Sequence, residues 1–292
     1  MSPETKGESV VRAFVLAGGG SLGAVEVGML RALEAAGVRP DLVVGSSVGA
    51  INSVFYAADP TRDGIGRLER IWRGLRRQDV FPVAVAGLTL GLLGRNGHLL
   101  SPAALGRLLR HNLPVKRLED TTIPVCVIAT DILRGSEVRL SSGPAVPALL
   151  ASAAIPGLFP PVRIGDRLLV DGGVANHTPI STAIALGATH VVVLPAGFPC
   201  MRADVPRGAV AIALHALNIM SAHHLAKDVD RHRGEAHIAV VPPLCPLSMS
   251  AYDFAGGSEV IDRAAETTSA WLGAGGMEME SSGAMIAPHH HL

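Results

Sequence analysis

Short runs of apolar residues alternate along the chain with longer segments in which apolar residues recur every three or four positions. Residues 11–17 form such a run, a glycine-rich turn follows, and residues 24–36 have helical spacing that ends at Gly37. The same order repeats at once, with a strand predicted at 41–44 and an apolar helix at 48–58. Two successive strand–turn–helix units predict a parallel sheet with helices packed on it.

The remaining pattern extends this α/β arrangement to residue 272. Helical spacing covers five further segments, at 65–77, 101–111, 178–186, 207–233 and 257–272, and strand character marks five more, at 123–129, 137–140, 167–170, 190–194 and 237–241. We expect one α/β domain over residues 11–272, with a central, largely parallel sheet between helices. A flexible amino terminus at 1–10 and a disordered tail at 273–292 are expected to flank it.

The composition fits a compact domain with an aliphatic core. Hydrophobic residues make up 48% of the 292 residues and charged residues 17%, which excludes a disordered chain, and aromatic residues contribute only 3%. Lysine plus arginine and aspartate plus glutamate number 25 each. Because the charges balance, no nucleic-acid partner is expected.

Three features predict a cytoplasmic protein whose membrane contact is peripheral. Residues 1–10 lack the apolar stretch of a secretory signal. The longest apolar run, 82–93, contains glycines and is shorter than the roughly 18 residues of a membrane-spanning helix. Cys126, Cys200 and Cys245 are scattered and odd in number, which predicts free thiols in a reducing compartment. Without a calcium-loop pattern or paired cysteine ligands, no metal cofactor is predicted.

The first glycine-rich turn, residues 18–23, follows a strand and opens a helix, so its backbone amides and the positive helix end can face an anion. Its glycines also satisfy the GxGxxG pattern of dinucleotide-binding folds. That interpretation requires an acidic residue at the end of the second strand, where this chain has Gly45, Ser46 and Ser47, with Asp41 at the strand's start. An oxyanion-binding loop explains the glycines better than a nucleotide site does.

The second turn, GSSVG at 45–49, matches the GxSxG pattern in which a serine occupies a strained turn between a strand and a helix. Ser47 is the central residue, and this geometry exposes its hydroxyl above the sheet with a helix amino terminus aimed at the developing oxyanion. A plain turn with serines capping the helix is the alternative. The strand before it, the helix after it and the glycine loop upstream favour a nucleophile.

A third element, Asp171-Gly172-Gly173, follows the strand predicted at 167–170. A carboxylate at this position can accept a serine proton directly. Taken alone, an Asp-Gly pair more often marks an ordinary turn. Its combination with Ser47 favours a catalytic role for Asp171.

Together, GGGxxG at 18–23, GSSVG at 45–49 and DGG at 171–173 resemble the patatin-like phospholipase family over about residues 11–195, with further matching positions at Ala153, Pro156, Phe159 and Pro160. The resemblance implies a three-layer α/β/α fold and a Ser-Asp dyad in which Ser47 is the nucleophile and Asp171 the general base. It implies oxyanion donors at Gly18, Gly19 and Gly20. It also implies a lipid or acyl ester substrate and no cofactor.

One position departs from that family, which commonly has Arg or Lys where this chain has Leu22. Loss of the cation favours a neutral acyl ester or thioester over a phospholipid. Two alternatives to hydrolysis stay open. One is an acyltransferase that uses the same acyl-Ser47 intermediate, and the other is a non-catalytic, lipid-binding regulatory protein.

Three other features have both a functional and a structural interpretation. His177 invites a catalytic triad, but it follows Asp171 too closely for the usual chain order, and a locally hydrogen-bonded loop histidine is the alternative. Five arginines make the polar side of the helix at 65–77 basic, which suits either anionic headgroups or a solvated face. The apolar segment 80–93 either covers an acyl pocket or forms a core helix.

Overall fold

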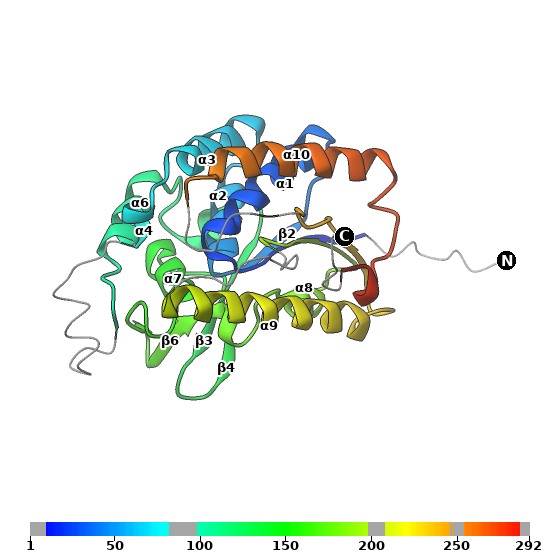
Figure 1. The fold of residues 1–292 in the computed structure, drawn as a ribbon. Coiled ribbons are helices and arrows are strands. Elements are labelled where there is room, and N and C mark those ends of the chain that lie inside the picture. Colours follow the sequence, from blue (N-terminus) through cyan, green and yellow to red (C-terminus); the bar gives the residue numbers. More distant parts are fainter. Residues whose placement is uncertain (1–9, 82–97, 198–207, 246, 248–253, 287–292) are drawn as a thin grey trace.

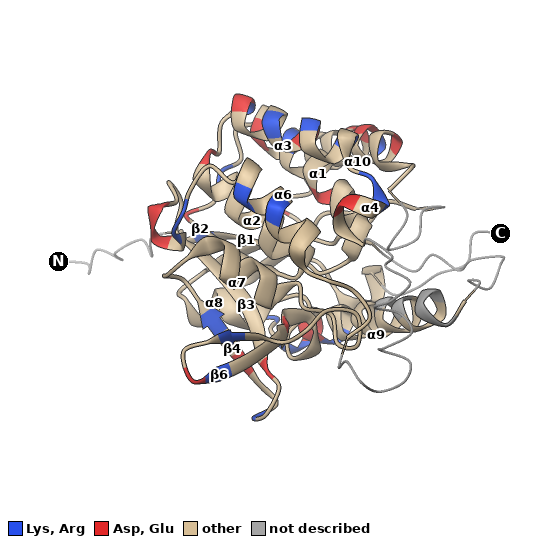
Figure 2. Cartoon of the chain, turned by 90° about the vertical axis from the view of Figure 1, so that its left-hand side faces the viewer, with Lys and Arg blue, Asp and Glu red and all other residues tan. Residues whose placement is uncertain are grey.

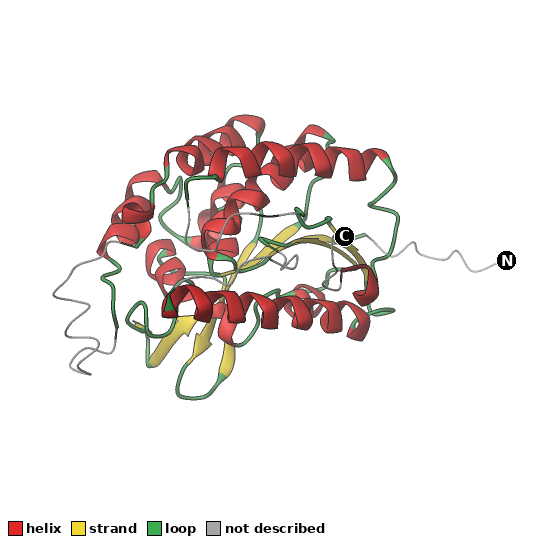
Figure 3. Cartoon of the chain, viewed as in Figure 1, coloured by secondary structure: helices red, strands yellow, loops and turns green. Residues whose placement is uncertain are grey.

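The computed structural model describes residues 10–81, 98–197, 208–245, 247 and 254–286. In this part of the chain an eight-stranded sheet runs through the centre, and helices pack on both of its faces (Figures 1 and 3). The predicted three-layer α/β/α fold is therefore confirmed.

Five strands form a parallel core in the order β3-β2-β1-β7-β8. They are β1 (Arg12–Leu16), β2 (Leu42–Ser46), β3 (Val125–Asp131), β7 (His190–Leu194) and β8 (His237–Val240). Three strands around β3 run antiparallel to their neighbours, namely β4 (Ser136–Leu140), β5 (Val162–Ile164) and β6 (Arg167–Asp171). The sheet is thus mixed, with the predicted parallel strands at its centre.

The helices divide between the two faces of the sheet (Figure 1). One face is covered by α1 (Gly23–Ala35), α2 (Val48–Ala58), α3 (Arg62–Gly74) and α10 (Gly257–Gly273). The other is covered by α8 (Ile180–Ala185) and α9 (Ala209–Arg231). Three more helices lie toward the end of the molecule where the chain forms β3 and β6, namely α4 (Arg77–Val80), α6 (Ala103–Asn112) and α7 (Ala145–Ser152).

The protein has a hydrophobic core on each face of the sheet, and side chains along β1 point alternately into one and the other. Phe14 and Leu16 pack with α1 and α2, whereas Ala13 and Val15 pack with α8 and α9, and all four are fully buried. A strand buried on both faces has a continuous apolar sequence. This is the pattern that predicted the strand at residues 11–17.

Among the elements that the sequence pattern did not predict are α7 and β5. The helix α7 is buried around most of its circumference, so its small and apolar residues lack amphipathic spacing. The strand β5 has three residues and pairs only with β6. In addition, α3 begins at Arg62 rather than at 65, because Thr61 Oγ1 accepts a hydrogen bond from the Gly64 amide and caps the helix.

Residues 274–286 pack on the domain, whereas the sequence predicted a disordered tail from 273. The Ser281 amide donates to the Ile238 carbonyl at 2.8 Å, and Ser281 Oγ accepts from the Val240 amide at 2.9 Å. This segment pairs with backbone groups of the edge strand β8. Ile286, in a short 3-10 helix, is buried in the core beneath α9. The predictions for 1–9, 82–97 and 287–292 lie outside the described residues.

The cysteines differ from expectation. Cys126 is a buried thiol, Cys200 lies outside the described residues, and Cys245 takes part in a disulfide bond. The prediction of three free thiols is therefore wrong at Cys245, and the argument for a reducing compartment loses its support. Among the described helices, none combines the length and the apolar character that crossing a bilayer requires.

Candidate active site

Ser47 occupies the turn between β2 and α2 with φ 54° and ψ −123°. It is the only non-glycine residue with a positive φ in the described part of the chain. Such a conformation costs about 1–3 kcal/mol and persists where the surroundings enforce it. Here the backbone packs so closely that a Cβ at Gly49 would collide with the carbonyl oxygens of Leu16 and Ala17. The structure thus contains the strained strand-to-helix turn that the GxSxG pattern predicted.

Asp171 reaches Ser47 because two strands meet end to end along one edge of β3. The strand β2 runs parallel to β3 and ends with Ser46 opposite Ile128, while β6 runs antiparallel and ends with Asp171 opposite Ala129. The strand β4 takes the other edge of β3 over the same residues. The last residues of β2 and β6 therefore arrive at adjacent positions from opposite directions.

A hydrogen bond joins the two side chains, with Ser47 Oγ donating to Asp171 Oδ2 at 2.7 Å. Asp171 Oδ1 accepts from the Gly173 amide at 2.8 Å, and the Asp171 carbonyl accepts from Thr130 Oγ1 at 2.8 Å. Asp171 is only 7% exposed. Burial raises the pKa of its carboxyl group to about 6, against the opposing effect of the two hydrogen bonds that the carboxylate accepts. Asp171 is therefore a stronger base than an exposed aspartate.

Ser152, at the end of α7, fixes the backbone of the serine turn. Its Oγ accepts from the Ser47 amide at 2.9 Å and donates to the Ile128 carbonyl at 2.5 Å. The side chain is fully buried. Ser152 carries no motif and ends a helix that the sequence pattern did not predict, so its role was not predicted.

The glycine-rich turn lies beside Ser47 and lines the same cleft. The Gly18 amide donates to the His177 carbonyl at 3.1 Å, so the protein itself already occupies one of the three predicted oxyanion donors. The amides of Gly19 and Gly20 have no acceptor among the described residues. Gly20 has φ 61°, which favours glycine at this position.

His177 lies next to the serine–aspartate pair without joining it. Its imidazole packs so closely on Gly18 and Gly173 that a Cβ at either glycine would crowd the ring. Burial lowers the pKa of His177 to about 4, which leaves the ring neutral near pH 7. Its Nδ1 has no hydrogen-bond partner among the described residues. Because Ser47 Oγ donates to Asp171, the geometry differs from a Ser-His-Asp triad.

Two cavities meet at Ser47. One is the cleft above the pair, whose walls include His177, Val174 and Leu217. The other is a cavity in which every lining side chain apart from Ser47 is apolar, with Trp72 and Phe254 among them. Val80 and Phe81 also line this second cavity, whereas the rest of the segment predicted at 80–93 lies outside the described residues.

A buried polar network connects the wall of the apolar cavity to the end of the glycine turn. Trp72 Nε1 donates to Asn52 Oδ1 at 2.9 Å, and Asn52 Nδ2 donates to the Gly23 carbonyl at 2.9 Å and to Glu26 Oε2 at 2.7 Å. Complete burial raises the pKa of Glu26 well above its usual range. The network supports the glycine turn from below, and no motif in the sequence predicted it.

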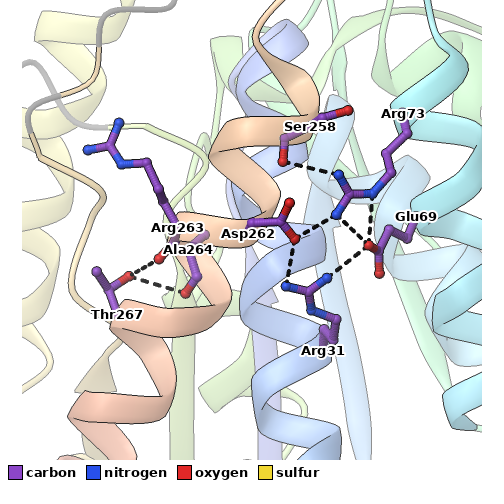
Figure 4. Close-up of polar contacts among 8 residues, drawn as sticks. All are labelled: Arg31, Glu69, Arg73, Ser258, Asp262, Arg263, Ala264 and Thr267. Carbon is purple, nitrogen blue, oxygen red and sulfur yellow. Dashed lines mark hydrogen bonds and ion pairs between the residues drawn. The ribbon is translucent and has the colours of Figure 1, made fainter.

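The basic side of α3 is partly neutralised within the protein. Arg73 bonds Glu69 and Asp262, and Arg31 of α1 bonds the same two carboxylates, which ties α1, α3 and α10 together (Figure 4). Arg67 pairs with Asp59. Acidic and basic positions are accordingly interspersed over this part of the surface (Figure 2). These contacts favour a structural role for Arg67 and Arg73 over headgroup binding.

The fold and the site define an α/β protein with a serine at a strand-to-helix turn and a buried carboxylate hydrogen-bonded to it. A family model of patatin-like phospholipases matches residues 14–184, which is more than half of the chain. The chain therefore belongs to the patatin-like phospholipase family.

Individual relatives share part of their sequence with the chain. Human patatin-like phospholipase domain-containing protein 6 is 30% identical over 187 residues, which cover 63% of the chain and 13% of that protein. An uncharacterized NTE family protein of Mycobacterium tuberculosis is 33% identical over 173 residues, covering 59% and 28%. The chain thus matches less than a third of the length of either relative.

Solved structures give a more distant likeness. VipD of Legionella pneumophila has a TM-score of 0.49 at 15% identity, covering 91% of the chain and 67% of that protein. Human GIVD cytosolic phospholipase A2 has a TM-score of 0.48 at 12% identity, covering 95% and 60%.

Replacing Ser152 with alanine tests the support of the serine turn. Ser152→Ala leaves the buried Ser47 amide without its acceptor, so we expect the free energy of unfolding to fall by about 1–3 kcal/mol. Ser53→Ala is the matched control, because Ser53 is equally buried but its Oγ has no hydrogen-bond partner among the described residues. Urea unfolding of both variants measures the difference, and equal stabilities would contradict the assigned role.

Proposed function

We propose that this protein is a serine acyl hydrolase that cleaves carboxylic ester bonds of lipids through Ser47 and Asp171. The observation that carries the proposal is the 2.7 Å hydrogen bond from Ser47 Oγ to the buried carboxylate of Asp171. A hydroxyl on a strained turn, a base that accepts its proton and an apolar cavity beside both are the parts that acyl transfer to serine requires.

In the first step Asp171 Oδ2 takes the proton of Ser47 while Oγ forms a bond to the carbonyl carbon of the ester. The carbonyl oxygen becomes an oxyanion, and the unengaged amides of Gly19 and Gly20, with the amino terminus of α2, supply donors for it. The intermediate then collapses, the bond to the alcohol breaks, and the alkoxide leaves with the proton held by Asp171. The acyl group stays on Ser47.

In the second step water adds to the acyl carbon as Asp171 accepts one of its protons. The Oγ–carbon bond then breaks, Ser47 recovers its proton and the free acid leaves. An acceptor alcohol or thiol in place of water would give acyl transfer by the same route. Analysis of the products with and without added acceptor distinguishes hydrolysis from transfer.

The cavities favour an acyl chain as the part of the substrate that is recognised. The wholly apolar cavity at Ser47 offers an alkyl chain an environment that excludes water. Leu22 is buried and packs against Ala196 and Gly197, away from the cleft. A headgroup cation is thus missing at this position, which favours recognition through the chain rather than through a charged phosphate.

Turnover of p-nitrophenyl esters by three variants tests the roles of the pair. We expect Ser47→Ala to lower kcat by at least about 10³-fold because the nucleophile is lost, and Asp171→Asn to lower it by a similar factor because the base is lost. Ser46→Ala is the matched control, since Ser46 Oγ is buried without a partner in the described structure. Turnover that is retained in Ser47→Ala contradicts the proposal. Absence of turnover in the wild type also contradicts it and would favour a non-catalytic protein.

The raised pKa of Asp171 predicts the pH dependence of kcat/KM. Only the carboxylate form accepts the serine proton, so activity should be full above the pKa of about 6 and fall about tenfold per pH unit below it. Because the pKa of His177 is lowered to about 4, His177→Ala should leave this inflection in place. An inflection that moves or disappears in His177→Ala would instead make the histidine the base.

A further inference from the structure

The helix α9 presents large apolar side chains to solvent. Ile212, Ile219 and Met220 are 49%, 37% and 54% exposed. Ile219 and Met220 follow Ile212 by seven and eight residues, so all three lie along one side of the helix, with the exposed Ala216 between them. A helix in water normally has charged residues on this side, so the exposed stripe departs from that pattern.

The opposite side of α9 holds the helix on the sheet. Ala222, Leu225 and Val229 recur every three or four residues and are buried in the core formed with α8 and the strands. The exposed stripe is therefore a fixed face of an anchored helix.

Charge along α9 divides the helix into two parts. Residues 209–226 contain no Asp, Glu, Lys or Arg. Lys227 and Arg231, both exposed, continue the line of Met220 and His223 toward the carboxyl end. Asp230 lies on the same side, where it accepts from the Gly283 amide at 2.8 Å and lies 3.8 Å from Arg233. An apolar stretch followed by two cations on the same side suits a surface that is apolar inside and anionic at its headgroups.

The same helix forms one wall of the cleft above Ser47. Leu217 and Ser221, one turn apart, line that cleft, and Val174, 59% exposed, lines it from the loop after Asp171. Leu217 is itself 49% exposed, so it belongs to both the cleft and the surface. The apolar stripe is thus continuous with the mouth of the cleft.

We propose that the exposed stripe of α9, comprising Ile212, Ala216, Ile219 and Met220, docks on the surface of a phospholipid bilayer and brings the cleft mouth against it. The inference rests on the proposed function in that the bilayer would supply the acyl chain. Docking places Leu217 and Val174 at the bilayer surface, where an acyl chain can pass to Ser47 without crossing bulk water. Lys227 and Arg231 then meet anionic headgroups beside the helix.

Sedimentation with vesicles of phosphatidylcholine and phosphatidylglycerol tests the surface. The double variant Ile212→Gln/Met220→Gln should reduce vesicle binding by about tenfold or more, because two apolar side chains no longer enter the bilayer. Leu186→Gln is the matched control, since Leu186 is 44% exposed but precedes β7, at the amino ends of the parallel strands, whereas Ser47 follows the carboxyl end of β2. Lys227→Gln/Arg231→Gln should weaken binding to the mixed vesicles and leave binding to pure phosphatidylcholine unchanged.

Hydrolysis of a water-soluble short-chain ester serves as the second measurement. The Ile212→Gln/Met220→Gln variant should retain wild-type turnover on this substrate, which would show that its fold and Ser47 are intact. Vesicle binding that is absent in the wild type, or equal in the Ile212→Gln/Met220→Gln and Leu186→Gln variants, overturns the docking surface. A wild-type dimer that the double variant converts to monomer also overturns it, because the stripe would then be a contact between two copies.

The two proposals fail separately. Ser47→Ala should bind vesicles as the wild type does, since docking requires no chemistry. Vesicle binding without ester turnover by the wild type would contradict the proposed hydrolase and support the docking surface. Ester turnover by the wild type without vesicle binding would support the hydrolase and contradict the docking surface.

Discussion

Burial of the Asp171 carboxylate beside Ser47 is the constraint on which the rest of the site depends. A carboxylate removed from water needs hydrogen-bond donors or takes up a proton. Ser47 Oγ and the Gly173 amide are the donors here. They are in reach because β2 and β6 end at neighbouring positions of β3. The antiparallel strand in an otherwise parallel centre therefore has a chemical consequence, since it returns the chain to the serine turn with a carboxylate at its end.

Close approach of backbones around this pair explains the glycines of the motifs. A Cβ at Gly172 would collide with the Ile128 carbonyl and press on Ser46 Oγ, and a Cβ at Gly49 would collide with β1. Because the backbone packs tightly around the pair, the open space next to Ser47 consists of the apolar cavity and the cleft that α9 lines. The site combines a rigid polar floor with apolar walls, an arrangement that suits a reacting carbonyl attached to an alkyl chain.

The sequence predicted the parts of the fold that depend on local pattern. The strands around residues 11–17 and 41–44 and the helix at 48–58 follow from apolar runs and turn glycines, and the family follows from three motifs. The pairing of Ser47 with Asp171 came from the combination of motifs and from the resemblance. The strand order that brings β6 and β2 to the same edge of β3 was not predicted, because strand order depends on contacts between distant segments. Ser152 and Asn52 were missed for the same reason, since a buried hydroxyl or amide acquires its role from partners that local pattern does not reveal. The packed segment at 274–286 escaped prediction because it is held by the edge of β8 rather than by its own composition.

Covalent labelling with a fluorophosphonate, followed by mass spectrometry of the peptides, tests the central claim most directly. If buried Asp171 activates Ser47, the wild type should gain a single phosphonyl adduct on Ser47, and Asp171→Asn should acquire it far more slowly at pH 8. An adduct on Ser46 or another residue, labelling that persists in Ser47→Ala, or equal rates in the wild type and Asp171→Asn would contradict the account.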